Sequence, residues 1–145
     1  ERGPSFGSTR GSLYDLFDTK HPIIQKLAVE LKSILVKVFK SDIFIIDSFF
    51  SIFGAGGGTI RHTHLTKEDK DSTFDLGKQK YSLVYYLSIG DQECLEPGFL
   101  KFYEPSEKIL PKKGMITIFP ANRQHSSVYG GKKDRVIVGA NFYKL

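Results

Sequence analysis

Residues 56–65 read GGGTIRHTHL, a run of glycines followed by alternating β-branched, basic and histidine residues. The alternation predicts a strand, in which residues two apart point to the same face. His62 and His64 would therefore project together, as ligands of one metal ion must. A His-x-His pair is weak evidence by itself, because histidine pairs also occur on surfaces. Its interpretation depends on what surrounds it in the chain.

The expected strands around this stretch are short and follow one another without intervening helices. From residue 42 onward the apolar residues recur with a period of two and are rich in β-branched and aromatic types. The expected strands are DIFIIDSFFSIF, GTIRHTH, YSLVYYLSI, GFLKFYEP, GMITIFP and DRVIVGANFY. This order favours an antiparallel sandwich or barrel and argues against a parallel α/β sheet.

A helix is expected before these strands. In residues 21–40 apolar side chains recur at helical spacing, and Pro22 stands near the start, where its missing N–H costs nothing. A shorter helix around SLYDLF, residues 12–17, is an option. The predicted fold class is thus mainly β with a flanking helix.

Length and composition fit a single domain. The 145 residues are 40% hydrophobic, which is enough for a core but leaves no length for a second domain. Residues 1–12 lack a starting methionine and are rich in Gly, Ser and Arg. We expect them to be disordered or linker-like, with one domain over residues 13–145.

Charge, cysteine content and hydropathy argue against several classes of protein. The net charge of +5 comes from lysines dispersed among acids, which is typical of a solvated surface and argues against nucleic acid as a partner. The single cysteine, Cys94, excludes an internal disulfide. No apolar run approaches the roughly 20 residues of a membrane-spanning helix. We therefore expect a soluble, intracellular protein that has no membrane partner.

Two residues far along the chain extend the histidine pair. His125 follows the expected strand GMITIFP, and strand ends at one mouth of a barrel bring distant residues together. Arg135 opens the expected strand DRVIVGANFY. If Arg135 faces inward it requires an anionic partner, whereas at a turn it would pair with Asp134 or another acid. Both interpretations of Arg135 remain open.

The order of these segments resembles the iron(II)- and 2-oxoglutarate-dependent dioxygenases, and within them the prolyl-hydroxylase-like branch. The resemblance covers residues 42–143 and rests on FGAGGGTIRHTH, YSLVYYL, PGFLKFYEP, PKKGMITIFPANRQHS and DRVIVGANFY in that order. It implies a double-stranded β-helix, that is, a jelly-roll or cupin-like barrel. It also implies an enzyme with Fe(II) and 2-oxoglutarate as cosubstrate, which hydroxylates a peptide or protein side chain or a small metabolite while decarboxylating 2-oxoglutarate.

The resemblance assigns roles by position. His62 and His125 match the iron ligands. Arg135 matches the residue that holds the distal carboxylate of 2-oxoglutarate, a task that suits a planar and permanently charged guanidinium. Tyr86 matches a position whose phenol reaches the same carboxylate, and Asn141 lies where the last strand approaches the pocket.

One position departs from the family pattern. The usual facial triad is two histidines and one carboxylate, and His64 stands where the carboxylate is expected. Three explanations remain open: His64 is a neutral third ligand, a carboxylate from the following segment folds back onto the iron, or the metal site is degenerate. The acids of that segment are Glu68, Asp69, Asp71 and Asp75.

Two other functions also remain open. Zinc held by His62, His64 and His125 would activate a water for hydration or hydrolysis. That function leaves Arg135 and Tyr86 without a role. Alternatively, the chain is a non-catalytic β-barrel binding module of a larger protein.

Overall fold

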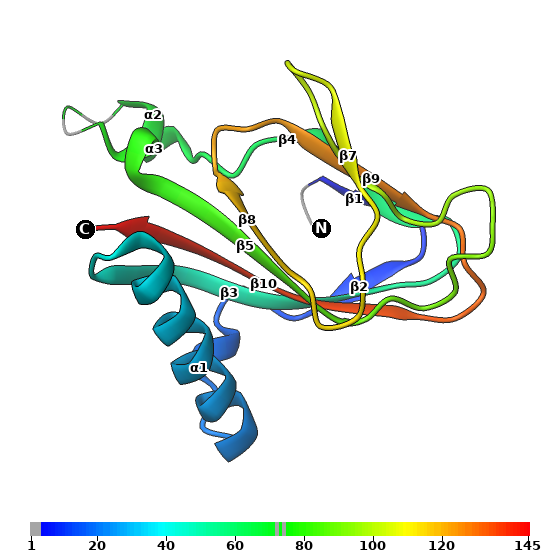
Figure 1. Ribbon diagram of the computed structural model, residues 1–145, viewed down its shortest axis with the longest axis horizontal. Coiled ribbons are helices and arrows are strands. Elements are labelled where there is room, and N and C mark those ends of the chain that lie inside the picture. The colour runs from blue at the N-terminus through cyan, green and yellow to red at the C-terminus, as the bar shows by residue number, and fades with distance from the viewer. Residues whose placement is uncertain (1–3, 72, 74) are drawn as a thin grey trace.

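The computed structural model describes residues 4–71, 73 and 75–145. Two five-stranded sheets form the two walls of a barrel, with strand orders β1-β4-β9-β6-β7 and β2-β3-β10-β5-β8 (Figure 1). The pairings within both sheets are antiparallel. This architecture is the predicted double-stranded β-helix, mainly β with a helix at its side.

The first sheet consists of β1 (Ser5–Phe6), β4 (Gly57–His62), β9 (His125–Tyr129), β6 (Leu100–Phe102) and β7 (Glu107–Ile109). The second sheet consists of β2 (Thr9–Gly11), β3 (Ile43–Phe53), β10 (Arg135–Lys144), β5 (Lys80–Ser88) and β8 (Ile116–Pro120). The helical elements are η1 (Leu16–Asp18), α1 (Pro22–Phe39), α2 (Lys67–Asp71) and α3 (Leu76–Gln79).

Helix α1 lies outside the barrel beside β3 (Figure 1). Its buried residues Leu31 and Leu35 belong to an apolar cluster with Val138 and Phe142 of β10. The helix begins as predicted, with Pro22 in its first turn and the His21 ring accepting a hydrogen bond from a backbone N–H. In the described part of the chain, no helix combines the length and apolarity needed to cross a membrane.

Strands β3 and β10 form the longest pairing of the second sheet. Their register runs from Ile43 opposite Lys144 to Phe53 opposite Arg135, with one shift after Asn141. Because alternate residues share a face, β3 presents one series of side chains to the barrel interior. The interior series that lines a cavity is Asp47, Phe49, Ser51 and Phe53.

The N-terminal segment differs from the expectation of a disordered linker. Residues 5–6 pair with β4 in the first sheet, and residues 9–11 pair with β3 in the second. Gly7, with a φ of +63°, turns the chain from one sheet to the other. The same glycine content that suggested a linker thus supplies a turn that most side chains would strain.

Candidate metal centre

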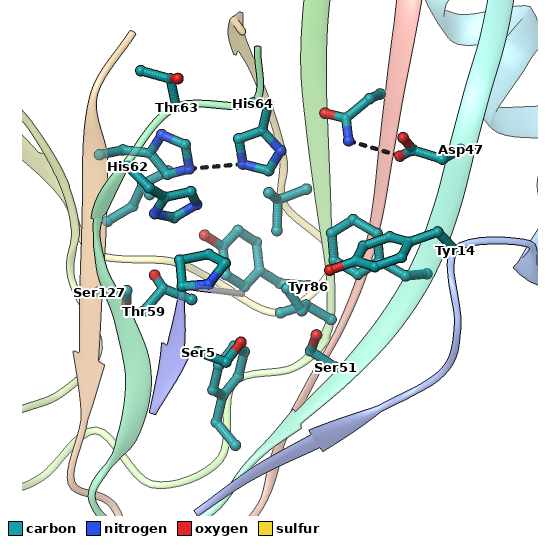
Figure 2. A pocket seen from close by; sticks show the side chains of 18 of the residues that line it. Ser5, Tyr14, Asp47, Ser51, Thr59, His62, Thr63, His64, Tyr86 and Ser127 are labelled. Atoms are coloured by element: carbon teal, nitrogen blue, oxygen red, sulfur yellow. Dashed lines mark hydrogen bonds between the residues drawn. The ribbon is translucent and has the colours of Figure 1, made fainter. Parts of the chain in front are cut away.

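The three predicted histidines meet in the barrel interior (Figure 2). His62 ends β4, His125 begins β9, and the two are partners in the pairing of these strands. One ring nitrogen from each histidine lies within 4.8 Å of the others. Within residues 4–71, 73 and 75–145, no other group of three His, Cys, Asp or Glu side chains gathers in this way.

His64 reaches the group by a route that the alternation did not predict. Strand β4 ends at His62, so His64 lies beyond the strand rather than on it. The backbone N–H of His64 donates to the carbonyl of Ala121, 2.8 Å away, which anchors it just past the end of β8. The convergence of His62 and His64 therefore depends on tertiary contacts and not on strand geometry alone.

Backbone carbonyls orient two of the rings. The Nδ1 atom of His62 lies 2.6 Å from the carbonyl oxygen of Ile60, and Nδ1 of His125 lies 2.9 Å from that of Arg123. Because a carbonyl only accepts hydrogen bonds, each Nδ1 carries the proton. Each Nε2 then keeps a free lone pair that can bind a metal. In metal-binding histidines, a hydrogen bond from the other ring nitrogen commonly fixes the orientation of the ring in this way.

The spacing of one nitrogen pair fits a shared ion. Nε2 of His64 lies 3.0 Å from Nε2 of His125. Two nitrogens, each about 2.0–2.1 Å from one metal and about 90° apart, would be separated by about 3 Å. At the same distance, Nε2–H of His64 can donate a hydrogen bond to Nε2 of His125. A bound metal ion would replace the proton between these two nitrogens.

Burial keeps these rings neutral. It lowers the pKa of His64 to about 3, aided by the neighbouring histidines, and the pKa of His125 to about 4. The pKa of His62 is also lowered by burial. Neutral imidazole is the form that binds metals, so at physiological pH no proton competes strongly for the three sites.

The carboxylates that follow the histidines lie elsewhere. Glu68, Asp71 and Asp75 are exposed, and Asp69, although buried, has other partners. Asp69 forms an ion pair of 2.8 Å with the buried Lys80. The hydroxyl of Tyr143 and the backbone N–H of Thr66 also donate to its carboxylate. In this structure none of these four acids joins the histidine group.

Arg135 is buried at the start of β10, with 2% of its surface exposed. Its Nε, Nη1 and Nη2 atoms donate to the carbonyls of Ile89, Gly98 and Pro97, at 3.2, 2.7 and 2.7 Å. The expected alternative, a surface pair with Asp134, is wrong. Asp134 instead pairs with the exposed Arg10, because Arg135 points into the barrel.

The positive charge of Arg135 has no carboxylate partner in the described part of the chain. Its guanidinium carbon lies 4.7 Å from the ring centre of Tyr129 and 6.0 Å from that of Tyr86. Burial lowers the pKa of Arg135, yet a guanidinium stays charged in proteins. A buried cation of this kind calls for an anionic ligand.

Tyr86 and Asn141, the other two predicted residues, are also buried. Burial raises the pKa of Tyr86 to about 12, so its hydroxyl is a hydrogen-bond donor at neutral pH. The Asn141 amide is already engaged: it accepts from the Ser82 hydroxyl at 2.6 Å and donates to Asp47 at 2.7 Å.

A cavity of about 310 Å³ joins these residues. Its lining includes all six predicted site residues: His62, His64, His125, Tyr86, Arg135 and Asn141. It also includes Asp47, which the sequence analysis missed. The available signal was the single charge of Asp47 inside the apolar run IFIIDSFF, residues 43–50.

No family model and no curated protein sequence matches the chain. Solved structures are similar in fold. HygX from Streptomyces hygroscopicus, with nickel and 2-oxoglutarate bound, superposes with a TM-score of 0.71 at 14% identity, covering 99% of this chain and 72% of that one. A Pseudomonas putida prolyl-4-hydroxylase gives 0.66 at 14% identity, covering 94% and 70%.

A third similar structure is a prolyl hydroxylase from Trichoplax adhaerens in complex with a peptide fragment of the hypoxia inducible factor oxygen degradation domain. Its TM-score is 0.68 at 16% identity, covering 94% of this chain and 63% of that one. The present chain thus spans 63 to 72% of the lengths of these three structures. It has the fold of the 2-oxoglutarate- and iron-dependent oxygenases, as the sequence resemblance predicted.

Proposed function

We propose that this protein is an Fe(II)- and 2-oxoglutarate-dependent dioxygenase that hydroxylates its substrate. One observation carries the proposal: three neutral, converging histidines line the same cavity as a buried arginine that has no carboxylate partner among the described residues. The histidines suit a divalent metal, and the arginine suits an acid. A ligand that is both a metal chelator and a carboxylate satisfies the two requirements together.

In this proposal His62, His125 and His64 hold the metal, with His64 in place of the usual carboxylate. A neutral third ligand leaves the bound ion more positive than a carboxylate would, which favours an anionic chelator on the remaining positions. Iron(II) bound there would supply the activation of O₂, and the overall reaction would convert a substrate C–H bond, O₂ and 2-oxoglutarate into C–OH, succinate and CO₂.

Arg135 binds the far carboxylate of 2-oxoglutarate in the same proposal. A guanidinium has five N–H groups, and three of them are used by backbone carbonyls. One N–H on each terminal nitrogen is left over and can donate to a carboxylate. The Tyr86 hydroxyl, kept protonated by burial, is the second donor.

The substrate is a peptide side chain or a small metabolite. The Trichoplax adhaerens structure, which has this fold, is bound to a peptide. A zinc-dependent hydrolase would use the three histidines equally well, and a non-catalytic binding module would need neither group. Both leave the buried charge of Arg135 without a function, so the oxygenase accounts for more of the cavity.

Succinate formation tests the proposal. The protein is incubated with iron(II), 2-oxoglutarate and O₂, and succinate is measured. We expect slow succinate release even without a hydroxylatable substrate, dependent on iron and O₂ and abolished in His125→Ala. The control is His21→Asn, which changes the fourth histidine outside the cavity and keeps a helix-capping side chain. Absence of succinate from the wild-type protein would contradict the proposal.

A further inference from the structure

Asp47 is a second charged group of the cavity, and neither the metal nor 2-oxoglutarate uses it. It lies on the inner face of β3, where it is paired with Asn141 of β10 in the strand register. Figure 2 shows Asp47 across the cavity from His62, on the same side as Tyr14. Asp47 therefore lines the same cavity as the three histidines, on its opposite side.

The Asp47 carboxylate is hydrogen-bonded, but it forms no ion pair in the part of the chain that the structure describes. Its side chain accepts a hydrogen bond of 2.7 Å from the Asn141 amide. Lys80, whose charge acts on Asp47, is itself held by Asp69 at 2.8 Å. Among the residues that the structure describes, no lysine, arginine or histidine forms an ion pair with Asp47.

Burial raises the pKa of Asp47, because a half-buried carboxylate is less well solvated, although Asn141 and Lys80 oppose the shift. A cation bound beside Asp47 would stabilise the charged carboxylate and so offset the hydration that the carboxylate loses through burial. The carboxylate is thus better satisfied in a complex than in the free protein.

Two aromatic rings stand beside this carboxylate. Phe49 follows Asp47 by two residues and so shares its face of β3, and the Tyr14 ring packs edge-on against Phe49 with ring centres 5.3 Å apart. The backbone of Tyr14 is tied to β3 by a hydrogen bond from the N–H of Ser48 at 3.1 Å. Gly139 makes room for Phe49, because a Cβ there would come within 2.4 Å of its ring.

A carboxylate next to aromatic rings is a combination that binds organic cations, by ion pairing and by attraction to the ring faces. We propose that Asp47, with Tyr14 and Phe49, recognises a protonated amine, either an ammonium or a guanidinium group, on the substrate. This inference rests on the proposed function and deepens it by naming the substrate's charge.

The charge distribution of the cavity supports this assignment. Arg135 and Asp47 have opposite charges and line one cavity, yet they form no ion pair with each other. Two ligands of opposite charge would neutralise them separately. The anionic cosubstrate would take Arg135, and the cationic substrate would take Asp47.

The test uses a fragment of known charge. Binding of n-butylammonium to the full protein is measured by ligand-observed NMR, with n-butanol as the matched neutral probe. We expect butylammonium to bind more tightly than butanol, and Asp47→Asn to weaken it about 10- to 100-fold, as the loss of a charged hydrogen-bond acceptor does. Asp42→Asn, the same change at an exposed position just before β3, should leave binding unchanged.

A second variant, at another residue of the proposed site, tests the inference even if the Asp47→Asn protein does not fold. Tyr14→Leu retains apolar bulk at a half-exposed position but removes the π face, and it should weaken butylammonium about two- to fivefold without affecting butanol. The inference is overturned if butanol binds as tightly as butylammonium, or if neither variant changes the preference.

Metal and 2-oxoglutarate affinities are measured on the same samples, and they separate the two proposals. If both ligands bind the wild-type protein and Asp47→Asn equally while the ammonium preference is absent, recognition by Asp47 fails and the oxygenase proposal stands. If the ammonium preference is present but 2-oxoglutarate does not bind, the proposed function fails instead.

Discussion

His62 and His125 lie directly opposite each other across β4 and β9, with ring centres 4.2 Å apart. They are 63 residues apart in the chain, and the pairing of two strands brings them together. The proposed metal site therefore belongs to the sheet itself, and its geometry depends on the β4–β9 register. His64, anchored by Ala121, joins from outside the strands.

Removing these histidines should have unequal effects on metal uptake. His62→Ala and His125→Ala each delete a ring oriented by a backbone carbonyl, so we expect neither to take up one equivalent of iron(II) or manganese(II). His64→Asp should bind the metal, since it restores the usual facial triad. Isothermal titration with each metal measures this. Equal, full uptake by His125→Ala would place the metal elsewhere.

Replacing Arg135 should separate cosubstrate binding from metal binding. Arg135→Lys keeps a charge but loses the planar, bidentate donor pair, and we expect 2-oxoglutarate affinity to fall by about 2 kcal/mol or more, roughly 30-fold. Metal affinity should be unchanged, because Arg135 is not among the converging histidines. Titration with 2-oxoglutarate at saturating metal tests this. Parallel losses of both affinities would sink the assigned role.

Gly98 provides a more selective perturbation of the same arginine. Its φ is +85°, and a Cβ there would lie 2.0 Å from Nη1 of Arg135. Gly98→Ala should therefore displace the guanidinium and weaken 2-oxoglutarate binding. Gly114→Ala is the matched control, because Gly114 has a φ of +81° and open space around its Cβ position. Both variants are strained, but only the first should lose cosubstrate affinity.

The Lys80–Asp69 pair should matter for stability. Both side chains are almost fully buried, so Lys80→Met would leave the Asp69 carboxylate uncompensated and lower the free energy of unfolding by about 3–5 kcal/mol. Lys78→Met, at an exposed position in α3, should change it little. Urea denaturation compares the two. A similar small effect for both would show that the buried pair contributes little.

Asp69 should also make stability depend on acid pH. Burial alone would raise its pKa, but hydrogen bonds from Lys80, Thr66 and Tyr143 outweigh burial and hold it well below the ordinary value of 3.8. The stabilisation is therefore fully present above pH 3.8 and is lost as the pH falls toward the lowered folded value. The stability difference between wild type and Asp69→Asn should shrink over that interval. A constant difference would contradict this.

Much of the barrel could be predicted because inward and outward residues alternate along each long strand. The period-two patterns of β3, β5 and β10 are visible in the sequence, as is the helical spacing of α1. The short strand β9, HSSVY, has no such pattern and is defined by its pairing with β4. Likewise β1 and β2, with two and three residues, are too short to be recognised without their partners.

The residues of the candidate site could be predicted from their side-chain chemistry. Contacts that depend on how the chain folds were harder to predict. Three histidines can hold a metal and an inward arginine can hold an acid, so these residue types suggested the candidate site before the fold was known. By contrast, the position of His64 depends on Ala121, and the capture of Asp69 depends on Lys80, eleven residues away. Asp47 is harder still, because a charge in an apolar strand is equally consistent with solvent exposure.

Anaerobic absorbance spectroscopy tests whether metal and 2-oxoglutarate bind at one site, as proposed. Metal-free protein is titrated with iron(II) and then with 2-oxoglutarate, and the visible spectrum is followed for the weak charge-transfer band of a keto acid chelated to iron. We expect a band that needs both ligands, disappears in His125→Ala and persists in His21→Asn. A wild-type protein that shows no band and binds zinc tightly instead would contradict the proposed function.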